Sequence, residues 1–131
     1  MATIEKFEDL EIWQLAREIC DDMFKLIQST SLGNDYALRD QINRSSGSVM
    51  DNIAEGFERN GNKEFIQFLS ISKASCGELR SQLYRALDRK YLGKALFEKY
   101  LEKLMLESKK ISSFIKYLNQ SEYKGSKYNR P

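Results

Sequence analysis

Apolar residues recur along almost the whole chain at alternating steps of four and three residues. This spacing places them on one side of an α-helix and predicts packed helices rather than a β-sheet. The first such stripe consists of Ile12, Ala16, Ile19, Met23 and Leu26. The 131 residues include a single proline, Pro131, and seven glycines, which disfavours a fold built on many tight turns. The pattern therefore indicates an all-α protein.

Four periodic segments follow one another with short breaks between them. We predict helices over residues 8–30, 35–59, 63–91 and 95–118. The second stripe consists of Leu38, Ile42, Ser45, Val49, Ile53 and Phe57. The fourth consists of Phe97, Leu101, Leu104, Ser108, Ile111, Ile115 and Leu118. Helices of similar length with short connections predict an antiparallel up-down-up-down four-helix bundle. The bundle is expected to form one domain, residues 1–118, followed by a frayed basic tail, residues 119–131.

The breaks carry residues that are typical of helix ends. Gly33 and Gly61 are predicted to end the first and second helices, because glycine tolerates the left-handed conformation found there. Asn34 or Asp35 is predicted to cap the second helix, and Asn62 the third.

Residues 43–60, NRSSGSVMDNIAEGFERN, have the composition of a loop but keep the helical period. We therefore predict that they lie within the second helix. A glycine inside a helix costs roughly 1 kcal/mol relative to alanine, and this cost is tolerated where a small residue lets another helix approach. Residues 45–48, SSGS, are accordingly expected to form a narrow waist around Gly47.

The small net charge of +2 conceals an asymmetry between the two halves of the chain. Residues 1–61 hold six Lys and Arg against twelve Asp and Glu, giving −6, and residues 62–131 hold fifteen against seven, giving +8. These halves can pair within the bundle, pair between subunits, or leave a basic surface for a polyanion.

Cysteine usage and the N-terminus favour a cytoplasmic protein. Cys20 and Cys76 are far apart and flanked by helix-forming residues, so we interpret them as reduced core thiols. The first residues carry acids where a signal peptide needs an apolar core, and no apolar run is long enough to span a bilayer.

Familiar catalytic motifs are missing from the sequence. There is no histidine, no glycine-rich phosphate loop and no nucleophile elbow. We therefore expect a non-enzymatic protein without a cofactor. Asp51 and Glu55 share a helix face, so a hard cation is conceivable there. The alternative is a solvated face in which Arg59 pairs with these carboxylates.

Basic residues concentrate in the second half. Our candidates for nucleic-acid binding are Arg80, Arg85, Arg89, Lys90 and Lys116. Lys73, Gly77, Arg80 and Tyr84 follow one helical stripe. Glutamates interrupt the basic residues of the fourth helix, so an ordinary solvated surface remains the alternative.

Several segments resemble one protein family. They are residues 10–16, LEIWQLA, residues 48–57, SVMDNIAEGF, and shorter matches at residues 64–69 and 75–83. Together they resemble the four-helix bundle family encoded by intervening sequences of bacterial 23S rRNA genes. The likeness covers about residues 7–118, and Asn-Ile-Ala-Glu-Gly is its most specific part.

The resemblance implies a cytoplasmic bacterial protein that forms a ring-like homo-oligomer, a pentamer in relatives, without established catalysis. One related branch, the accessory variability determinant of diversity-generating retroelements, binds nucleic acid and a reverse transcriptase through a basic surface. Candidates for structural or subunit contacts are Trp13, Asn52, Glu55, Gly56 and Phe57. A buried Asn52 would fix helix register or a subunit contact, whereas an exposed amide would do neither.

This chain departs from its relatives at two points. Met50 stands where relatives commonly have proline, so the second helix is expected to run straighter. The chain is also nearly neutral, whereas the retroelement branch is strongly basic.

Three functions follow from these observations. The first is an oligomeric scaffold that presents a basic surface to RNA, DNA or a nucleic-acid enzyme. The second is a protein-interaction module in which acids such as Glu18, Asp21 and Asp22 pair across a subunit boundary. The third is a metal site or hydrolase at Asp51 and Glu55.

Overall fold

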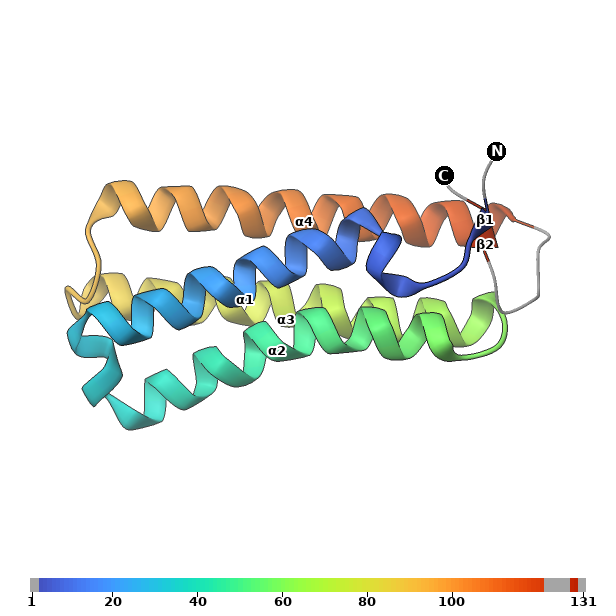
Figure 1. Ribbon diagram of the computed structural model, residues 1–131. Coiled ribbons are helices and arrows are strands. Elements are labelled where there is room, and N and C mark those ends of the chain that lie inside the picture. Colours follow the sequence, from blue (N-terminus) through green and yellow to red (C-terminus); the bar gives the residue numbers. More distant parts are fainter. Residues whose placement is uncertain (1–2, 122–127, 130–131) are drawn as a thin grey trace.

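The computed structural model describes residues 3–121 and 128–129 of the chain. Four helices make up most of it: α1 (Glu11–Ser29), α2 (Tyr36–Glu58), α3 (Asn62–Asp88) and α4 (Lys94–Gln120). Each helix contacts the next, and α1 also contacts α4 (Figure 1). The all-α up-down arrangement is therefore confirmed. The helices begin and end within three residues of the predicted ranges.

The predicted stripes of α1 and α2 form the core. In α1 the buried residues are those of the predicted stripe, and the predicted residues of α2 are buried as well. Residues 43–58 lie inside α2, which continues without a break past Met50.

The buried face of α4 differs from the predicted one. Its buried residues are Phe97, Tyr100, Leu104, Glu107, Ile111, Phe114 and Leu118. The predicted Leu101, Ser108 and Ile115 are only half-buried. Both sets obey the same four-three spacing, and α4 has contacts with both α1 and α3. The buried face is centred one position earlier, so that Tyr100, Glu107 and Phe114 are buried in place of Leu101, Ser108 and Ile115. This shift places Glu107 in the core.

The connection between α1 and α2 contains the short 3₁₀ helix η2 (Ser31–Asn34). Gly33 lies inside η2 and does not end α1, whose C-cap is Thr30. A Cβ atom at Gly33 would lie 2.6 Å from the carbonyl oxygen of Ile27, so a larger residue would collide with the backbone. Of the two predicted capping residues, Asp35 is the one that caps α2, and its Oδ1 accepts a hydrogen bond from the Leu38 amide at 3.4 Å.

Asp35 also joins two helix termini that lie at the same end of the bundle (Figure 1). Its Oδ2 accepts hydrogen bonds from Arg89 at 2.7 Å and from the Tyr91 hydroxyl at 2.8 Å. The Tyr91 and Arg89 hydrogen bonds lower the pKa of this carboxyl. The start of α2 is thereby tied to the chain that follows α3.

The start of α3 corrects a second capping prediction. Gly61, with φ of 109°, is the N-cap, and Asn62 is already the first residue of the helix. The Asn62 side chain instead donates a hydrogen bond to the carbonyl oxygen of Leu118 at 2.9 Å. Asn62 therefore links α3 to the last turn of α4.

Small side chains form the contact between α2 and α3. The Ser72 hydroxyl donates to the carbonyl oxygen of Val49 at 2.7 Å, and the Ser48 and Ser75 hydroxyls are 2.7 Å apart. Gly47 is not the point of close approach, because a Cβ atom there would meet only a carboxylate oxygen of Asp51 at 4.0 Å. Of the predicted waist, Ser48 contacts α3 through Ser75 and Ser45 does so by donating a hydrogen bond to Glu78, whereas Gly47 is not a point of close approach.

The ends of the described chain pair with each other. β1 (Thr3–Ile4) and β2 (Tyr128–Asn129) form an antiparallel pair, with Thr3 opposite Asn129 and Ile4 opposite Tyr128. A second 3₁₀ helix, η1 (Phe7–Asp9), leads from β1 into α1. Of the predicted tail, residues 119–120 belong to α4 and residues 128–129 pair with β1, whereas residues 122–127 and 130–131 lie outside the described residues.

Many opposite charges of the two halves pair within this bundle. Lys103 of α4 pairs with Asp22 at 2.7 Å and with Glu18 at 3.3 Å, and Lys110 pairs with Glu11 at 3.4 Å. Asp21 pairs with Lys25 at 2.9 Å on its own helix. None of the helices within the described residues is apolar over a stretch long enough to span a lipid bilayer.

Candidate nucleic-acid interface

A groove of about 480 Å³ runs between α3 and α4. It is lined by Lys73, Arg80, Met105, Leu106, Ser108, Lys109 and Ser112. All of these side chains are exposed or half-buried, so the groove opens on the surface. Three cations, two hydroxyls and an apolar edge thus share one concave surface.

The helical period explains how the groove is assembled. Lys73 and Arg80 are seven residues apart, which is two turns and about 10 Å along the helix. Both therefore lie on the same side of α3, with Gly77 between them. The helix α4 is the antiparallel neighbour of α3 and forms the opposite wall of the groove (Figure 1). Lys109 lines the groove from this wall.

The cations of this groove are available to an anion. No ion pair joins Lys73, Arg80 or Lys109 to a carboxylate among residues 3–121 and 128–129. The positive stretch is bounded on α4 by the exposed Glu98 and Glu102. Unpaired cations beside hydroxyl donors are suited to contacts with phosphate oxygens.

Two ionisable groups lie in the core between α3 and α4. Burial, together with the nearby Glu107 carboxyl, raises the pKa of the Cys76 thiol to about 12, although Arg80 and Lys73 act in the opposite direction. Burial raises the pKa of Glu107 to about 8, partly offset by Lys110. At neutral pH Glu107 therefore carries a proton and adds no negative charge near the groove. Cys20 and Cys76 are both free thiols.

The five predicted nucleic-acid contacts are not brought together in one patch. Arg80 lies in the groove, whereas Arg85 donates a hydrogen bond to Gln41 of α2 and Arg89 pairs with Asp35. Lys90 follows α3 and adopts a φ of 63°. The fifth candidate, Lys116, is exposed towards the end of α4.

The groove also contains residues that were not among the candidates. Lys73 shares the stripe of Arg80, so its place on α3 was predictable. Lys109 could not be assigned from the sequence, because its position opposite Arg80 depends on the register between α3 and α4.

Most of the predicted contact residues are engaged within the chain. Gly56 and Phe57 are buried, and Phe57 packs edge-on against Phe65 with ring centroids 6.0 Å apart. Trp13 is half-buried against Phe7, at 5.2 Å between centroids. The half-buried Asn52 amide donates hydrogen bonds to the carbonyl and hydroxyl oxygens of Ser48 at 2.8 and 2.9 Å. Asn52 thus braces Ser48, which in turn contacts Ser75 of α3.

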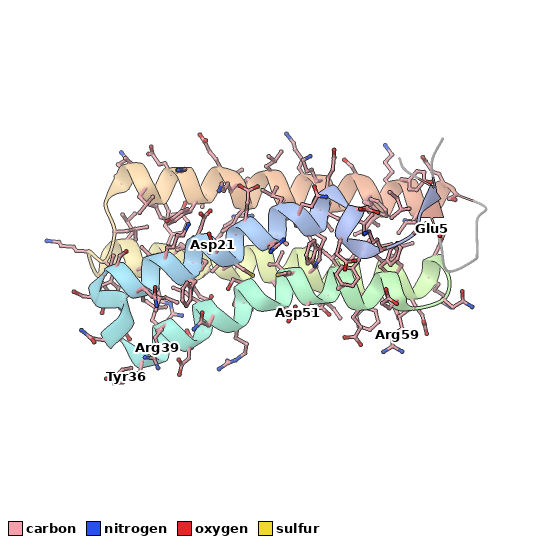
Figure 2. All side chains as sticks on the ribbon, in the orientation of Figure 1. Glu5, Asp21, Tyr36, Arg39, Asp51 and Arg59 are labelled. Carbon is pink, nitrogen blue, oxygen red and sulfur yellow. The ribbon has the colours of Figure 1, made fainter. Side chains whose placement is uncertain are left out.

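The acids of α2 form an exposed face. Arg59 pairs with Glu55 at 3.0 Å, and both Asp51 and Arg59 point away from the bundle (Figure 2). Within the described residues, no group of three or more His, Cys, Asp or Glu side chains is arranged to hold a metal ion. The predicted ion pair between Arg59 and Glu55 is therefore present.

A second hollow, of about 330 Å³, lies between the N-terminal segment and α4. Its apolar wall includes Ile4 and Phe114. It contains two lysines and two acids: Lys110 is paired with Glu11, Asp9 supplies the second carboxylate, and Lys109 is the lysine that also lines the α3–α4 groove. This hollow is more enclosed than the α3–α4 groove but less suited to a polyanion, because its charges cancel.

Comparison with known proteins identifies the family. The model of the 23S rRNA-intervening sequence protein family matches residues 8–124, a range that contains all four helices. The chain belongs to this family. No curated protein matches the chain.

A solved structure supports the fold assignment. It is a protein of unknown function from the S23 ribosomal protein family of Bacteroides thetaiotaomicron, with 22% sequence identity and a TM-score of 0.73. The match covers 80% of this chain and 98% of the other. At this identity the similarity establishes the shared fold alone.

Proposed function

We propose that this member of the 23S rRNA-intervening sequence protein family is a non-enzymatic, homo-oligomeric scaffold that binds the phosphate backbone of RNA or DNA through the α3–α4 groove. The observation that carries the proposal is the grouping of Lys73, Arg80 and Lys109 around one groove without carboxylate partners among the described residues. A nucleic-acid enzyme is a further partner, by resemblance to the retroelement branch.

Removal of the groove cations tests this function. We expect the triple variant Lys73→Gln, Arg80→Gln and Lys109→Gln to bind a fluorescein-labelled RNA hairpin more weakly than the unaltered protein. Each lost phosphate contact should reduce the slope of log affinity against log salt by about one unit, because fewer counterions are released. Fluorescence anisotropy over about 50 to 200 mM salt would measure both effects.

The matched control removes the same charge elsewhere. Arg44, Lys63 and Lys99 are exposed, lie outside the groove and have no ion-pair partner among the described residues. Their triple substitution by glutamine should leave most of the binding intact. Equal losses in the two triple variants would show that net charge, not the groove, governs binding. Absence of binding by the unaltered protein at low salt would refute the proposal.

The homo-oligomer is a separate part of the proposal. By resemblance we expect a pentamer, so light scattering coupled to size-exclusion chromatography should give a mass five times that of the 15.3 kDa chain. A mass equal to that of one chain would contradict the ring.

A protein-interaction module without nucleic-acid binding is the competing function. It is favoured by Met105 and Leu106, which are 54% and 47% exposed at the edge of the groove. The acids expected to form the subunit boundary are less available, because Glu18 and Asp22 already pair with Lys103. A pull-down with this protein as bait, in which a partner protein stays bound after nuclease treatment, would favour this function.

A further inference from the structure

We infer, on the basis of the proposed function, that the α3–α4 groove binds single-stranded nucleic acid, with phosphates beside Lys73 and Arg80, the ligand backbone against Gly77, and a base stacked on Tyr84. Four features of the groove and its surroundings carry this inference. They are the stripe on α3, the open position at Gly77, the exposed ring of Tyr84 and the apolar edge on α4.

The four α3 residues form a continuous line. Lys73, Gly77, Arg80 and Tyr84 are spaced by four, three and four residues, so they lie on one side of the helix and span about 16 Å. Lys73 and Arg80 line the groove. Tyr84 contacts Phe97 of α4 with ring centroids 4.9 Å apart, so it also lies at the α3–α4 seam.

Gly77 has no role in packing within the chain. It is exposed in the middle of α3, and a Cβ atom there would meet nothing within 4 Å. An exposed glycine weakens a helix, so packing and helix stability do not explain why Gly77 lies between Lys73 and Arg80. Without a side chain at this position, a ligand backbone can come close to α3 between Lys73 and Arg80.

Tyr84 has the geometry of a stacking platform. Its side chain is 50% exposed, while its edge-on contact with Phe97, at an interplanar angle of 66°, holds the ring in place. Beyond Arg80 the surface is of mixed charge, since Glu98 and Glu102 are exposed beside Lys94 and Lys99 on the part of α4 next to Phe97. That end of the line is therefore better suited to an uncharged base face than to a phosphate.

These features distinguish a single strand from a duplex. In a duplex the base faces are covered by stacking on one another, so they are not available to an aromatic side chain, whereas an unpaired base can stack on an aromatic ring. Met105 and Leu106 add apolar surface on the facing wall, where they would contact sugars or bases rather than phosphates. A duplex would use the cations but not Tyr84 or the apolar edge.

The test compares one labelled RNA of about 12 nucleotides, a length that a small single-strand-binding surface covers, with the same RNA annealed to its complement. We expect the single strand to bind more tightly. Tyr84→Leu keeps an apolar contact with Phe97 but removes stacking, and should weaken single-strand binding about tenfold while leaving duplex binding unchanged. Tyr84→Phe retains the ring and should bind like the unaltered protein.

A second variant tests the open position. Gly77→Gln should weaken single-strand binding even though thermal melting shows an equally or more stable helix, because the new side chain occupies the space between the cations. Gly77→Ala, with a smaller side chain, should have a smaller effect.

The outcomes separate this inference from the function on which it rests. If the duplex binds as tightly as the single strand and Tyr84→Leu affects both alike, the groove reads only the backbone, and the single-strand inference is wrong while the proposed function stands. If neither RNA binds the unaltered protein at low salt, the proposed function itself fails. Binding of an acidic protein in place of RNA would overturn both.

Discussion

Replacement of Glu107 by glutamine will stabilise the bundle, and the stabilisation will increase as the pH is raised from about 5 to about 9. Glu107 is 0% exposed, and neither carboxylate oxygen has a hydrogen-bond partner within the described structure. Its charged form is therefore disfavoured in the folded protein. Glutamine has nearly the same shape and does not ionise.

The sign of this effect follows from the two pKa values. Burial raises the pKa of Glu107 from 4.5 to about 8 in the folded protein. Between these values the unfolded chain has lost the proton and the folded chain has kept it. The free energy of unfolding therefore falls by about 1.4 kcal/mol per pH unit across this window and levels off above it. The glutamine variant lacks this loss, so its advantage should grow by up to about 4 kcal/mol.

Urea unfolding monitored by circular dichroism at several pH values would measure this advantage. Other titrating groups are common to both proteins and cancel in the difference between them. The groups that act on the Glu107 region are Lys110 on the same helix and the Cys76 thiol, which stays protonated over this range. Glu102→Gln, an exposed change on α4, is the control and should show little pH-dependent gain. Parallel stability profiles for Glu107→Gln and the unaltered protein would exclude a buried, protonated carboxyl.

The second large effect is expected at Gly56. A Cβ atom there would lie 2.7 Å from Cβ of Phe68 and 2.9 Å from Cδ1 of Phe65. Phe65 is fully buried and also packs against Phe114, at 5.6 Å between ring centroids, so it has little freedom to move. We expect Gly56→Ala to reduce the free energy of unfolding by about 1 to 3 kcal/mol through overpacking.

Gly77→Ala provides the matched comparison, because it introduces the same methyl group on a helix where nothing lies within 4 Å. It should raise the free energy of unfolding by about 0.5 to 1 kcal/mol, since alanine favours the helix. Urea midpoints of the two variants should therefore move in opposite directions. A gain at both glycines would show that α2 and α3 are not in close contact at Gly56.

The helical period correctly predicted the buried stripes of α1 and α2, although Ser46 and Gly56 are buried as well, and it misplaced the buried face of α4. In α1 and α2 a single set of apolar residues fits the helical period. In α4 two sets fit it, and they share Phe97, Leu104, Ile111 and Leu118. The predicted set contains Leu101 and Ile115, whereas the observed set contains Glu107, a residue type that is rarely found in a protein core. Local periodicity could not show that packing on both α1 and α3 would select the second set.

The candidate groove was predictable only in part, for a related reason. The basic character of the second half and the stripe through Lys73 and Arg80 follow from composition and helical period. The neighbours of that stripe across the groove, Lys109 and Ser112, depend on the offset between two antiparallel helices. No spacing within one helix encodes that offset. Arg85 and Arg89 were candidates like Arg80, but they point towards α2. Arg85 contacts Gln41 of α2, and Arg89 pairs with Asp35, the N-cap of α2.

The short ladder between β1 and β2 has a practical consequence for engineering. Because Thr3 lies opposite Asn129, the two ends of the described chain emerge side by side at one end of the bundle (Figure 1). A short linker should therefore join them, and the chain could be reopened at the turn around Gly61 to give a circular permutant with the same helix packing. In such a permutant α3 and α4 would come first in the polypeptide, so the order of synthesis of the bundle could be changed without altering its folded form.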